Sequence, residues 1–297
     1  MATSWVAQRA GNWSVVSGDG ASPWHDGGAQ TALNTIPAGG DSVDLMSFDV
    51  AQDAGATTIP PTGALVLLKA TTTGRLTVNQ DTITTAVLNV ATLTTGTATT
   101  GLVATSGTVS TTNTFAVSNN GSACAATGGD GASMVCVYHG SKAVLNITAS
   151  AVGGTASATC AIHNASSGTV NMTGNGTGGS GIQAAALRNS TSGVFNVSNG
   201  TLTGNATATQ SPGMWAGGPG PITLTNVNMV NTTNGSSAYT GKTPTWTNTS
   251  KANYAQWGST KYGPEPAAAQ MLSGVVCGST TGAAAKIPAI GRGGLVG

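Results

Sequence analysis

The sequence is poor in charge and has no long apolar run. Of its 297 residues, 10 are Lys or Arg and 9 are Asp or Glu, so only 6% are charged, which is too few for an ordinary globular surface. No apolar stretch approaches the roughly 18 residues that a membrane-spanning helix needs. We therefore expect a soluble chain with no membrane partner and with an unusual, neutral surface.

Small polar residues take the place of charge. Thr, Ser and Asn are abundant, and there are 44 Gly. Ser, Thr and Asn compete with helical hydrogen bonds through their side chains, and Gly loses the most backbone entropy in a helix. The composition therefore predicts an all-β protein.

A secretory signal and a disulfide pattern are also missing. The opening MATSWVAQRA has no apolar core behind a basic start. We expect the chain to fold in the cytoplasm where it is made, in a reducing compartment that argues against a disulfide framework. None of the cysteines has the CxxC spacing of zinc sites, and all are expected to be small buried thiols: Cys124, Cys136, Cys160 and Cys277.

The few charges are unevenly placed. Residues 1–130 carry eight carboxylates against three basic residues, whereas residues 131–297 carry seven basic residues against Glu265, which gives −5 and +6. The difference would suit a polar attachment or head-to-tail contacts between copies. An accidental imbalance on a thinly charged surface is an equally open interpretation.

Two stretches match each other, CAIHNASSGTVNMTG from Cys160 and AALRNSTSGVFNVSN from Ala185. A third copy lies upstream, and its offset is one position shorter between His139 and His163 than between Asn146 and Asn171, as if one residue slipped in a turn. A period of about 25 residues indicates a repeat architecture.

The repeat unit has a strand pattern. Segments such as TVNMT and VFNVS alternate between apolar and polar residues, and Gly- and Asn-rich clusters turn the chain with no helical segment between them. We predict a single-stranded parallel β-helix of about 25 residues per coil and about eight coils, in which equivalent strands lie about 4.8 Å apart. The expected inward columns are Leu145, Val170, Phe195 and Ile147, Met172, Val197.

Stacking explains the missing charge. A column of Lys or Glu would bring like charges to strand spacing, whereas Thr, Ser and Asn columns can hydrogen-bond to one another. Asn164 and Asn189 are expected at a turn, where Asn tolerates a left-handed backbone and bonds to its own main chain.

Tryptophan is absent between Trp24 and Trp215 and clusters towards both ends. A solenoid must cover its exposed edges. We therefore divide the chain into an N-terminal cap (1–40), the β-helix (41–235), and a C-terminal cap with an irregular docking tail (236–297).

Two stretches resemble parts of known virion proteins. IPAGGDSVDL, followed by VAQDAGATTIPPTGALVLL, resembles the opening coils of many extracellular or virion β-helices. GPEPAAAQMLSGVVCGSTTGAAAKIP is similar to a C-terminal motif of phage structural proteins, P-x-x-x-D-V-x-x-G-V-x-Y-G-x-x-x-G-T-x-x-x-P. The matching positions are Pro266, Gly274, Val275, Gly278, Gly282 and Pro288. The departures are Gln270, Met271, Cys277 and Ala283 in place of Asp, Val, Tyr and Thr. The resemblance implies a phage structural protein of decoration, fibre or spike type, with these residues in a docking tail.

Carboxylates are missing from the whole stretch between Gly131 and Pro264. Glycoside hydrolysis generally needs two carboxylates facing the scissile bond, and a calcium-dependent lyase needs a cluster of them near a base. Asp41 and Asp44 are interpreted as turn and strand-edge residues. The sequence predicts no catalytic residue, no cofactor and no metal, and therefore no enzyme.

Three polar residues are predicted to form a column on adjacent coils: His139, His163 and Arg188. Two imidazoles one rung apart could share a metal, but a third ligand is missing and Arg188 continues the column with a positive charge. We interpret the column as a solvent-facing polar ladder. Cys136 and Cys160 are expected to share another column with Ala185, at a spacing that would permit a disulfide in principle.

The sequence thus favours a non-enzymatic structural component of a bacteriophage virion, a rigid β-helical rod that contacts other capsid or tail proteins. Self-association is expected, with a trimer among the open arrangements. The alternative is a tail fibre or tailspike-like adhesin that binds a host surface glycan. A bacterial surface adhesin is a third class, which the lack of a signal peptide disfavours. Nucleic acid is not an expected partner, because no basic patch is present.

Overall fold

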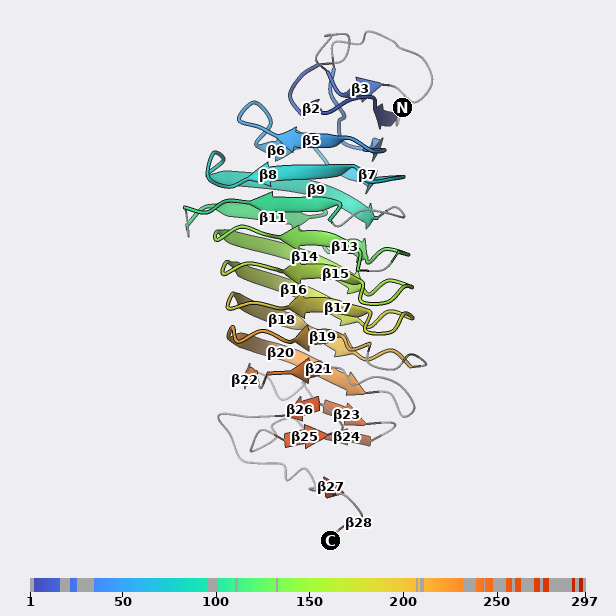
Figure 1. Cartoon of the computed structure of the whole chain (residues 1–297), viewed down its shortest axis with the longest axis vertical. Helices are drawn as coiled ribbons and strands as arrows, with labels where there is room; N and C mark the ends of the chain where they lie inside the picture. The colour runs from blue at the N-terminus through green and yellow to red at the C-terminus, as the bar shows by residue number, and fades with distance from the viewer. Residues whose placement is uncertain are drawn as a thin grey trace.

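The chain folds into an elongated stack of β-strands (Figure 1). The structure is a computed structural model, and it describes residues 3–16, 22–25, 35–95, 101–109, 112–131, 133–206, 208, 211–231, 239–242 and 244–247, together with six short strands beyond them. Within these residues there are strands, turns and bends but no helix, and so no helix that could cross a membrane. The all-β prediction is confirmed.

The larger of the two main sheets has 15 strands, and we call it sheet A. Its strands are β1 (Ser4–Ala7), β3 (Trp24–His25), β4 (Ser42–Asp44), β6 (Thr58–Ile59), β7 (Leu65–Lys69), β9 (Thr85–Thr94), β11 (Thr114–Ser118), β12 (Cys124–Thr127), β14 (Val144–Val152), β16 (Thr169–Thr177), β18 (Val194–Thr203), β20 (Ile222–Asn231), β22 (Thr245–Thr247), β23 (Ala255–Trp257) and β24 (Thr260–Tyr262).

The second main sheet, sheet B, has nine strands. They are β2 (Gly11–Asn12), β5 (Asp49–Gln52), β8 (Arg75–Asn79), β10 (Val103–Ser106), β13 (Val135–His139), β15 (Cys160–Asn164), β17 (Ala185–Asn189), β19 (Met214–Ala216) and β21 (Tyr239–Gly241). Two hairpins follow near the C-terminus, β25 (Gln270–Leu272) with β26 (Val275–Cys277) and β27 (Ile290–Gly291) with β28 (Gly294–Leu295).

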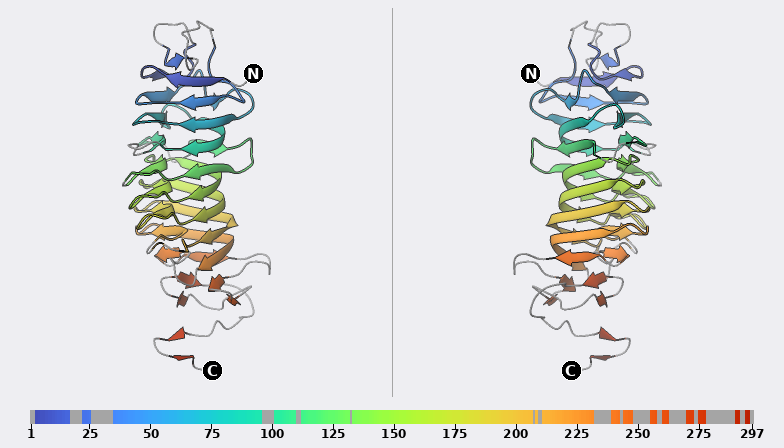
Figure 2. Two further views of the ribbon diagram at one scale, coloured as in Figure 1. Left: turned by 90° about the vertical axis from the view of Figure 1, so that its right-hand side faces the viewer. Right: turned by 90° about the vertical axis from the view of Figure 1, so that its left-hand side faces the viewer.

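The chain winds as a parallel β-helix of about seven turns, roughly 26 residues apart. In each regular coil a short sheet B strand is followed by a tight turn, a long sheet A strand and a loop that leads to the next coil (Figures 1 and 2). Strands of successive coils pair in parallel, as β14 does with β16 and β16 with β18. The predicted fold class is therefore confirmed, with about one turn fewer than expected.

The predicted inward columns are confirmed. Leu145 pairs with Val170, which pairs with Phe195, and the parallel series runs from Ile147 through Met172 to Val197. All six side chains are at most 2% exposed, and they belong to a single apolar cluster shared by both sheets. Fully burying such a side chain contributes roughly 1.5 to 3 kcal/mol, so these columns hold successive coils in register.

The outward columns of sheet A are made of neutral polar side chains. The Asn171 amide donates to Oδ1 of Asn146 at 2.9 Å, and the Asn196 amide donates to Oδ1 of Asn171 at 2.9 Å. Beside them, the hydroxyls of Thr173 and Ser198 lie 3.1 Å apart. An amide or a hydroxyl is both donor and acceptor, so it can repeat along a column without leaving a group unpaired. A charged residue cannot repeat in this way.

Asn164 and Asn189 lie at the ends of β15 and β17 rather than within a turn. Both are fully buried, and neither has a positive φ, so the expected left-handed backbone is wrong. The expected bonding to the main chain is confirmed, because each amide reaches across the following turn and donates to a carbonyl four residues later, that of Gly168 at 3.1 Å or of Gly193 at 2.9 Å. Their role is to close the turn from inside.

The hydroxyls of these turns form a second ladder. Ser166 donates to the carbonyl of Ser141 one coil away and accepts from the backbone N–H of Gly168 at 3.1 Å. Thr191 repeats the arrangement, donating to the carbonyl of Ser166 and accepting from the N–H of Gly193. Each turn is therefore bonded to the turn of the preceding coil.

The loops on the opposite edge stack with the same period as the strands, although their sequences differ. Ser133, Ala158 and Gln183 occupy the same place in three successive loops, and their φ angles are 61°, 59° and 60°. The backbones of these loops are close together: a Cβ on Gly153 would overlap the carbonyl oxygen of Ala184. The repeat therefore extends through the loops as well as the strands.

The tryptophans near the N-terminus are buried at the first coils. Trp13 and Trp24 meet edge-on with ring centroids 4.5 Å apart, and the indole N–H of Trp24 donates to the carbonyl of Trp13 at 2.9 Å. The indole N–H of Trp5 donates to Asp41 at 2.8 Å. The boundaries of the three proposed regions, at 40 and 235, stay predictions.

Candidate functional site

The predicted ladder of His139, His163 and Arg188 is wrong in one member. His163 pairs with Arg188, but its partner in the preceding coil is Tyr138, while His139 pairs with Asn164. The spacing from Tyr138 to His163 equals that from His163 to Arg188, so the slip inferred from matching the two histidines does not exist. Because side chains alternate across a strand, an error of one residue moved His139 to the wrong face.

His139 points inward and is fully buried. Its Nε2 lies 3.2 Å from the carbonyl oxygen of Ala143 and its Nδ1 lies 2.8 Å from Oγ1 of Thr105. A carbonyl only accepts, so Nε2 carries the proton and Nδ1 accepts from the threonine. Burial lowers the pKa of His139 to about 4, which keeps the ring neutral. His139 closes its turn as Asn164 and Asn189 close theirs.

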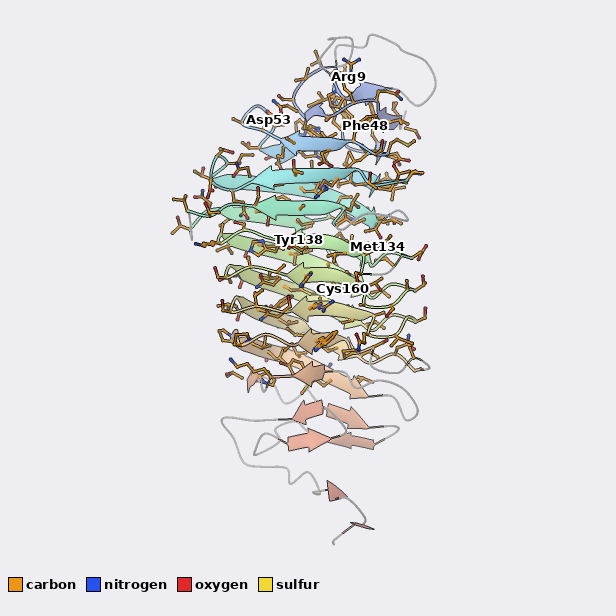
Figure 3. All side chains as sticks on the ribbon, viewed as in Figure 1. Arg9, Phe48, Asp53, Met134, Tyr138 and Cys160 are labelled. Carbon is orange, nitrogen blue, oxygen red and sulfur yellow. The ribbon has the colours of Figure 1, made fainter. Side chains whose placement is uncertain are left out.

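The true outward column on sheet B is Tyr138, His163, Arg188 and Trp215. The rings of Tyr138 and His163 meet edge-on with centroids 5.6 Å apart. The guanidinium of Arg188 lies over the Trp215 ring, 4.6 Å from its centroid, in cation–π geometry. We call these four residues the aromatic–arginine column; Figure 3 shows Tyr138 on the sheet B face, at β13.

The positive charge of this column belongs to Arg188. Burial, together with the nearby Arg188, lowers the pKa of His163 to about 4, so its ring is neutral at physiological pH. Nε2 of His163 lies 2.7 Å from Oγ of Ser190. Arg188 makes no ion pair within the described residues, and its one hydrogen bond, to the carbonyl of Ala158, is long at 3.5 Å.

A groove lies beside the column. It has a volume of about 470 Å³, and its lining residues are Arg75, Gly101, Ala104, Ser133, Val135, Tyr138, His163 and Arg188. Ala104, the partner of Tyr138 in the preceding coil, contributes only a methyl group to this lining. Arg75 adds a second guanidinium, which is paired with Asp49 at 3.1 Å. None of the lining residues carries a carboxylate.

Asp41 and Asp44 accept hydrogen bonds from the backbone, which agrees with their interpretation as turn and strand-edge residues. Asp41 accepts from the N–H groups of Thr3 and Ala38 at 2.8 and 2.9 Å, besides the indole of Trp5. Asp44 accepts from the N–H of Met46 and of Thr71, both at 2.9 Å.

Neighbouring hydrogen-bond donors stabilise the ionised form of Asp44. Burial opposes ionisation, but the hydrogen bonds from Thr71, Met46 and Lys69 outweigh it and lower the pKa of Asp44 below its ordinary value. The Lys69 ammonium lies 3.2 Å from the carboxylate. Asp44 is thus an ionised structural residue at neutral pH.

The expected cysteine column is also wrong in register. Cys160 pairs with Val135 and Ala185, so Cys136 occupies the neighbouring position. The prediction of buried thiols is confirmed for Cys124, Cys136 and Cys160, which are free and buried. Burial raises the pKa of Cys124 to about 11 and of Cys160 to about 12, and it also raises that of Cys136, so all three stay protonated and unreactive.

Within the described residues, no three His, Cys, Asp or Glu side chains gather where they could hold a metal ion.

The proposed docking residues fall mostly outside the described residues. Val275 begins β26, which pairs antiparallel with β25. The other five, Pro266, Gly274, Gly278, Gly282 and Pro288, lie outside the described residues, and their role stays a prediction.

Sequence reasoning missed Tyr138, Trp215 and Arg75 as neighbours of His163 and Arg188. Trp215 lies further along the chain from Arg188 than Arg188 does from His163, and between Arg75 and Tyr138 one coil spacing is longer still, that from Val103 to Val137. The alternation of apolar and polar residues within β13 was the signal for Tyr138, because it places Val137 inward and Tyr138 outward.

No protein family matches the sequence, and no curated protein and no solved structure is detectably similar to it. Any function assigned to the chain must therefore come from its own residues.

Proposed function

We propose that the chain is a non-enzymatic structural component of a bacteriophage particle, a rigid β-helical rod displayed at the particle surface as a decoration, fibre or spike protein. The observation that carries the proposal is the continuous parallel pairing of strands from β13 to β20, in which the register shifts once within β16, between Thr173 and Gly176. Core columns, Asn columns and turn hydroxyls all bond one coil to the next. An assembly bonded in this way is suited to a rigid, mechanical role.

The composition of the groove supports a role without catalysis. A glycosidase needs two carboxylates on either side of the scissile bond, and the groove is lined by none. In the N-terminal coils, the carboxylates of Asp41 and Asp44 already accept hydrogen bonds from backbone N–H groups. Incubation of the full chain with bacterial capsule and lipopolysaccharide should release no reducing ends and no unsaturated sugars. Turnover of either polymer would overturn this part of the proposal.

The assignment to a phage particle rests on the six positions of the C-terminal stretch that resemble a motif of phage structural proteins. Its test is a truncation of residues 263–297 in the phage or prophage that encodes the chain. The truncated chain should fold, as judged by circular dichroism and protease resistance, and should be absent from purified particles by mass spectrometry. Incorporation of the truncated chain at the normal level would refute the docking tail, and absence of the full-length chain from particles would refute the assignment itself.

Receptor binding is the second candidate function. The observation that favours it is the aromatic–arginine column, because the rod itself needs no stacked guanidinium and indole on its neutral surface. Glycan binding by the full chain that is lost when Trp215 is replaced would favour this function over a purely structural one.

A further inference from the structure

We infer that the groove beside Tyr138 binds an acidic saccharide, a sugar chain that carries carboxylate groups. The inference goes beyond the structural role, since a rod can be displayed on a particle with or without a ligand. It names the chemical class that the receptor-binding candidate would recognise.

The first argument is the isolation of the positive charge. Only 6% of the chain is charged, and the surface of the regular coils is built from Asn, Thr and Ser. Arg188 interrupts this surface, makes no ion pair within the described residues and has a single long hydrogen bond. A guanidinium has five N–H donors in a planar fork, so most of its hydrogen-bonding capacity remains open to a ligand.

The second argument is the geometry with which a guanidinium binds a carboxylate. Arg binds carboxylates through two parallel N–H···O bonds, which contribute binding energy and also define the orientation of the carboxylate. Stacking on Trp215 holds the Arg188 plane in one orientation before any ligand arrives. Arg75 lines the same groove and adds positive charge, although Asp49 already engages it. The groove therefore has a positive wall and no opposing carboxylate.

The third argument is the aromatic surface. Tyr138 lines the groove, and Trp215 extends the same column beyond Arg188. The face of an aromatic ring is electron-rich, so it attracts the weakly positive C–H groups on the flat side of a sugar ring. The groove volume of about 470 Å³ falls within the range of about 300 to 1,000 Å³ typical of small-ligand sites.

Nucleic acid fits the groove less well than a sugar acid. Binding to a phosphate backbone relies on several Lys and Arg side chains along the path of the strand. Here two guanidinium groups are present, one of them already paired, and the net charge of the chain is only +1.

The test is calorimetric titration of the full chain with oligogalacturonate, alginate oligosaccharides and sialyllactose. Methyl-esterified oligogalacturonate serves as the neutral counterpart, and sulfated oligosaccharide and single-stranded DNA serve as alternative anions. We expect at least one carboxylated sugar to bind and, if it is oligogalacturonate, its ester to bind at least tenfold more weakly. Failure of all three carboxylated probes, or a preference for sulfated sugar or for DNA, would overturn the inference.

Single substitutions test whether the saccharide binds in this groove. Arg188→Gln should weaken binding at least tenfold, and Trp215→Leu should weaken it severalfold, with circular dichroism and melting temperature unchanged because both side chains lie on the outer face. Lys142→Gln is the matched control, since it removes one positive charge from an exposed turn outside the groove. Equal loss in Lys142→Gln and Arg188→Gln would show non-specific attraction and contradict the proposed site. None of these outcomes bears on the structural role, which depends on folding and on presence in particles.

Discussion

The first coils and the regular coils use different side chains to bind the N–H groups of their turns. Between residues 35 and 95, turn N–H groups are bound by carboxylates, as at Asp44 and Asp53. Between residues 133 and 203, hydroxyl and amide oxygens accept from the turn N–H groups instead, as Ser166 does from Gly168 and Asn164 does from Ser166. In the first coils the partner of Asp44 in the next coil is Lys69. In the regular coils equivalent positions repeat, and a repeating column must be neutral.

This contrast explains the uneven charge of the sequence. A carboxylate is a strong acceptor, but two of them at strand spacing repel, so each needs a basic or neutral residue above it. Asp49 stacks on Arg75, and Asp130 accepts from the hydroxyl of Thr155 at 2.8 Å. The stretch without carboxylates, between Gly131 and Pro264, begins where the coils become regular. The predictions below test this contrast, from the largest expected effect to the smallest.

Charging a repeating column should cause the largest loss. In the triple variant Asn146→Asp, Asn171→Asp, Asn196→Asp, two amide bonds are lost and three carboxylates lie about 4.8 Å apart. Repulsion between such charges amounts to roughly 1 to 3 kcal/mol per pair, so we expect a loss on the order of 4 kcal/mol in the free energy of unfolding. Urea denaturation measures it, and added salt should restore part of the loss.

The control for this variant places the same three charges where they do not stack. The triple variant Thr62→Asp, Asn120→Asp, Ser180→Asp puts them on exposed positions of separate turns. It should lose less than about 1 kcal/mol. A loss equal to that of the stacked variant would show that net charge, and not the column, is responsible.

Close packing of the loops should give the next largest effect. Gly153→Ala forces a Cβ into the backbone of the neighbouring loop, and we expect it to destabilise the fold by about 2 to 3 kcal/mol. Gly121, in the irregular loop between β11 and β12, has φ of 82° and open space around it, so Gly121→Ala should lose only about 1 kcal/mol from backbone strain. Equal melting temperatures for the two variants would contradict the stacked loops.

A smaller effect is expected from Asp44→Asn in the first coils. The substitution weakens charge-assisted hydrogen bonds and the contact with Lys69, which should lower stability by roughly 2 kcal/mol at pH 7. Because the pKa of Asp44 is lowered by folding, its contribution is present above the ordinary carboxyl pKa and is lost as the pH falls through the lower folded value. The variant and the natural chain should therefore converge in stability at strongly acidic pH, which thermal melts at a series of pH values would show.

The smallest effect at neutral pH should come from His139→Asn, which gives this turn the residue found at positions 164 and 189. Since the folded pKa of His139 is about 4 and its ordinary value is 6.5, the unfolded chain binds the proton more readily, and stability falls as the pH drops from 6.5 towards 4. The variant should match the natural chain within about 1 kcal/mol at pH 7.5 and lose less stability below pH 6. An unchanged pH dependence would mean that the ring is not held neutral by burial.

The fold could be predicted from the sequence because the strand pattern repeats at the same spacing from β14 through β16 to the start of β18. Leu145, Val170 and Phe195 share chemistry as well as position, so their column could be predicted from apolar alternation alone. His139 and His163 share only identity, and matching them placed one on the wrong face. Parity along the strand is the more reliable guide, since the alternation of faces is fixed by backbone geometry.

The candidate site was less predictable because its parts do not repeat. Ser133, Ala158 and Gln183 share a backbone conformation but no side-chain chemistry, so their loops could not be aligned from residue types. The groove joins Arg75 to Arg188 across coils of unequal length. Such a combination follows from the stacking of coils of unequal length, which a single sequence spacing does not define.

The register of the regular coils can be measured directly by cysteine cross-linking. Thr173 and Ser198 face outward as partners in adjacent coils, so Thr173→Cys with Ser198→Cys should form a disulfide under mild oxidation, detected by mass spectrometry. Thr173→Cys with Asn196→Cys lies on the same face but two residues out of register, and it should remain reduced. Efficient cross-linking of the second pair, with none of the first, would contradict the regular stacking of coils on which the whole account depends.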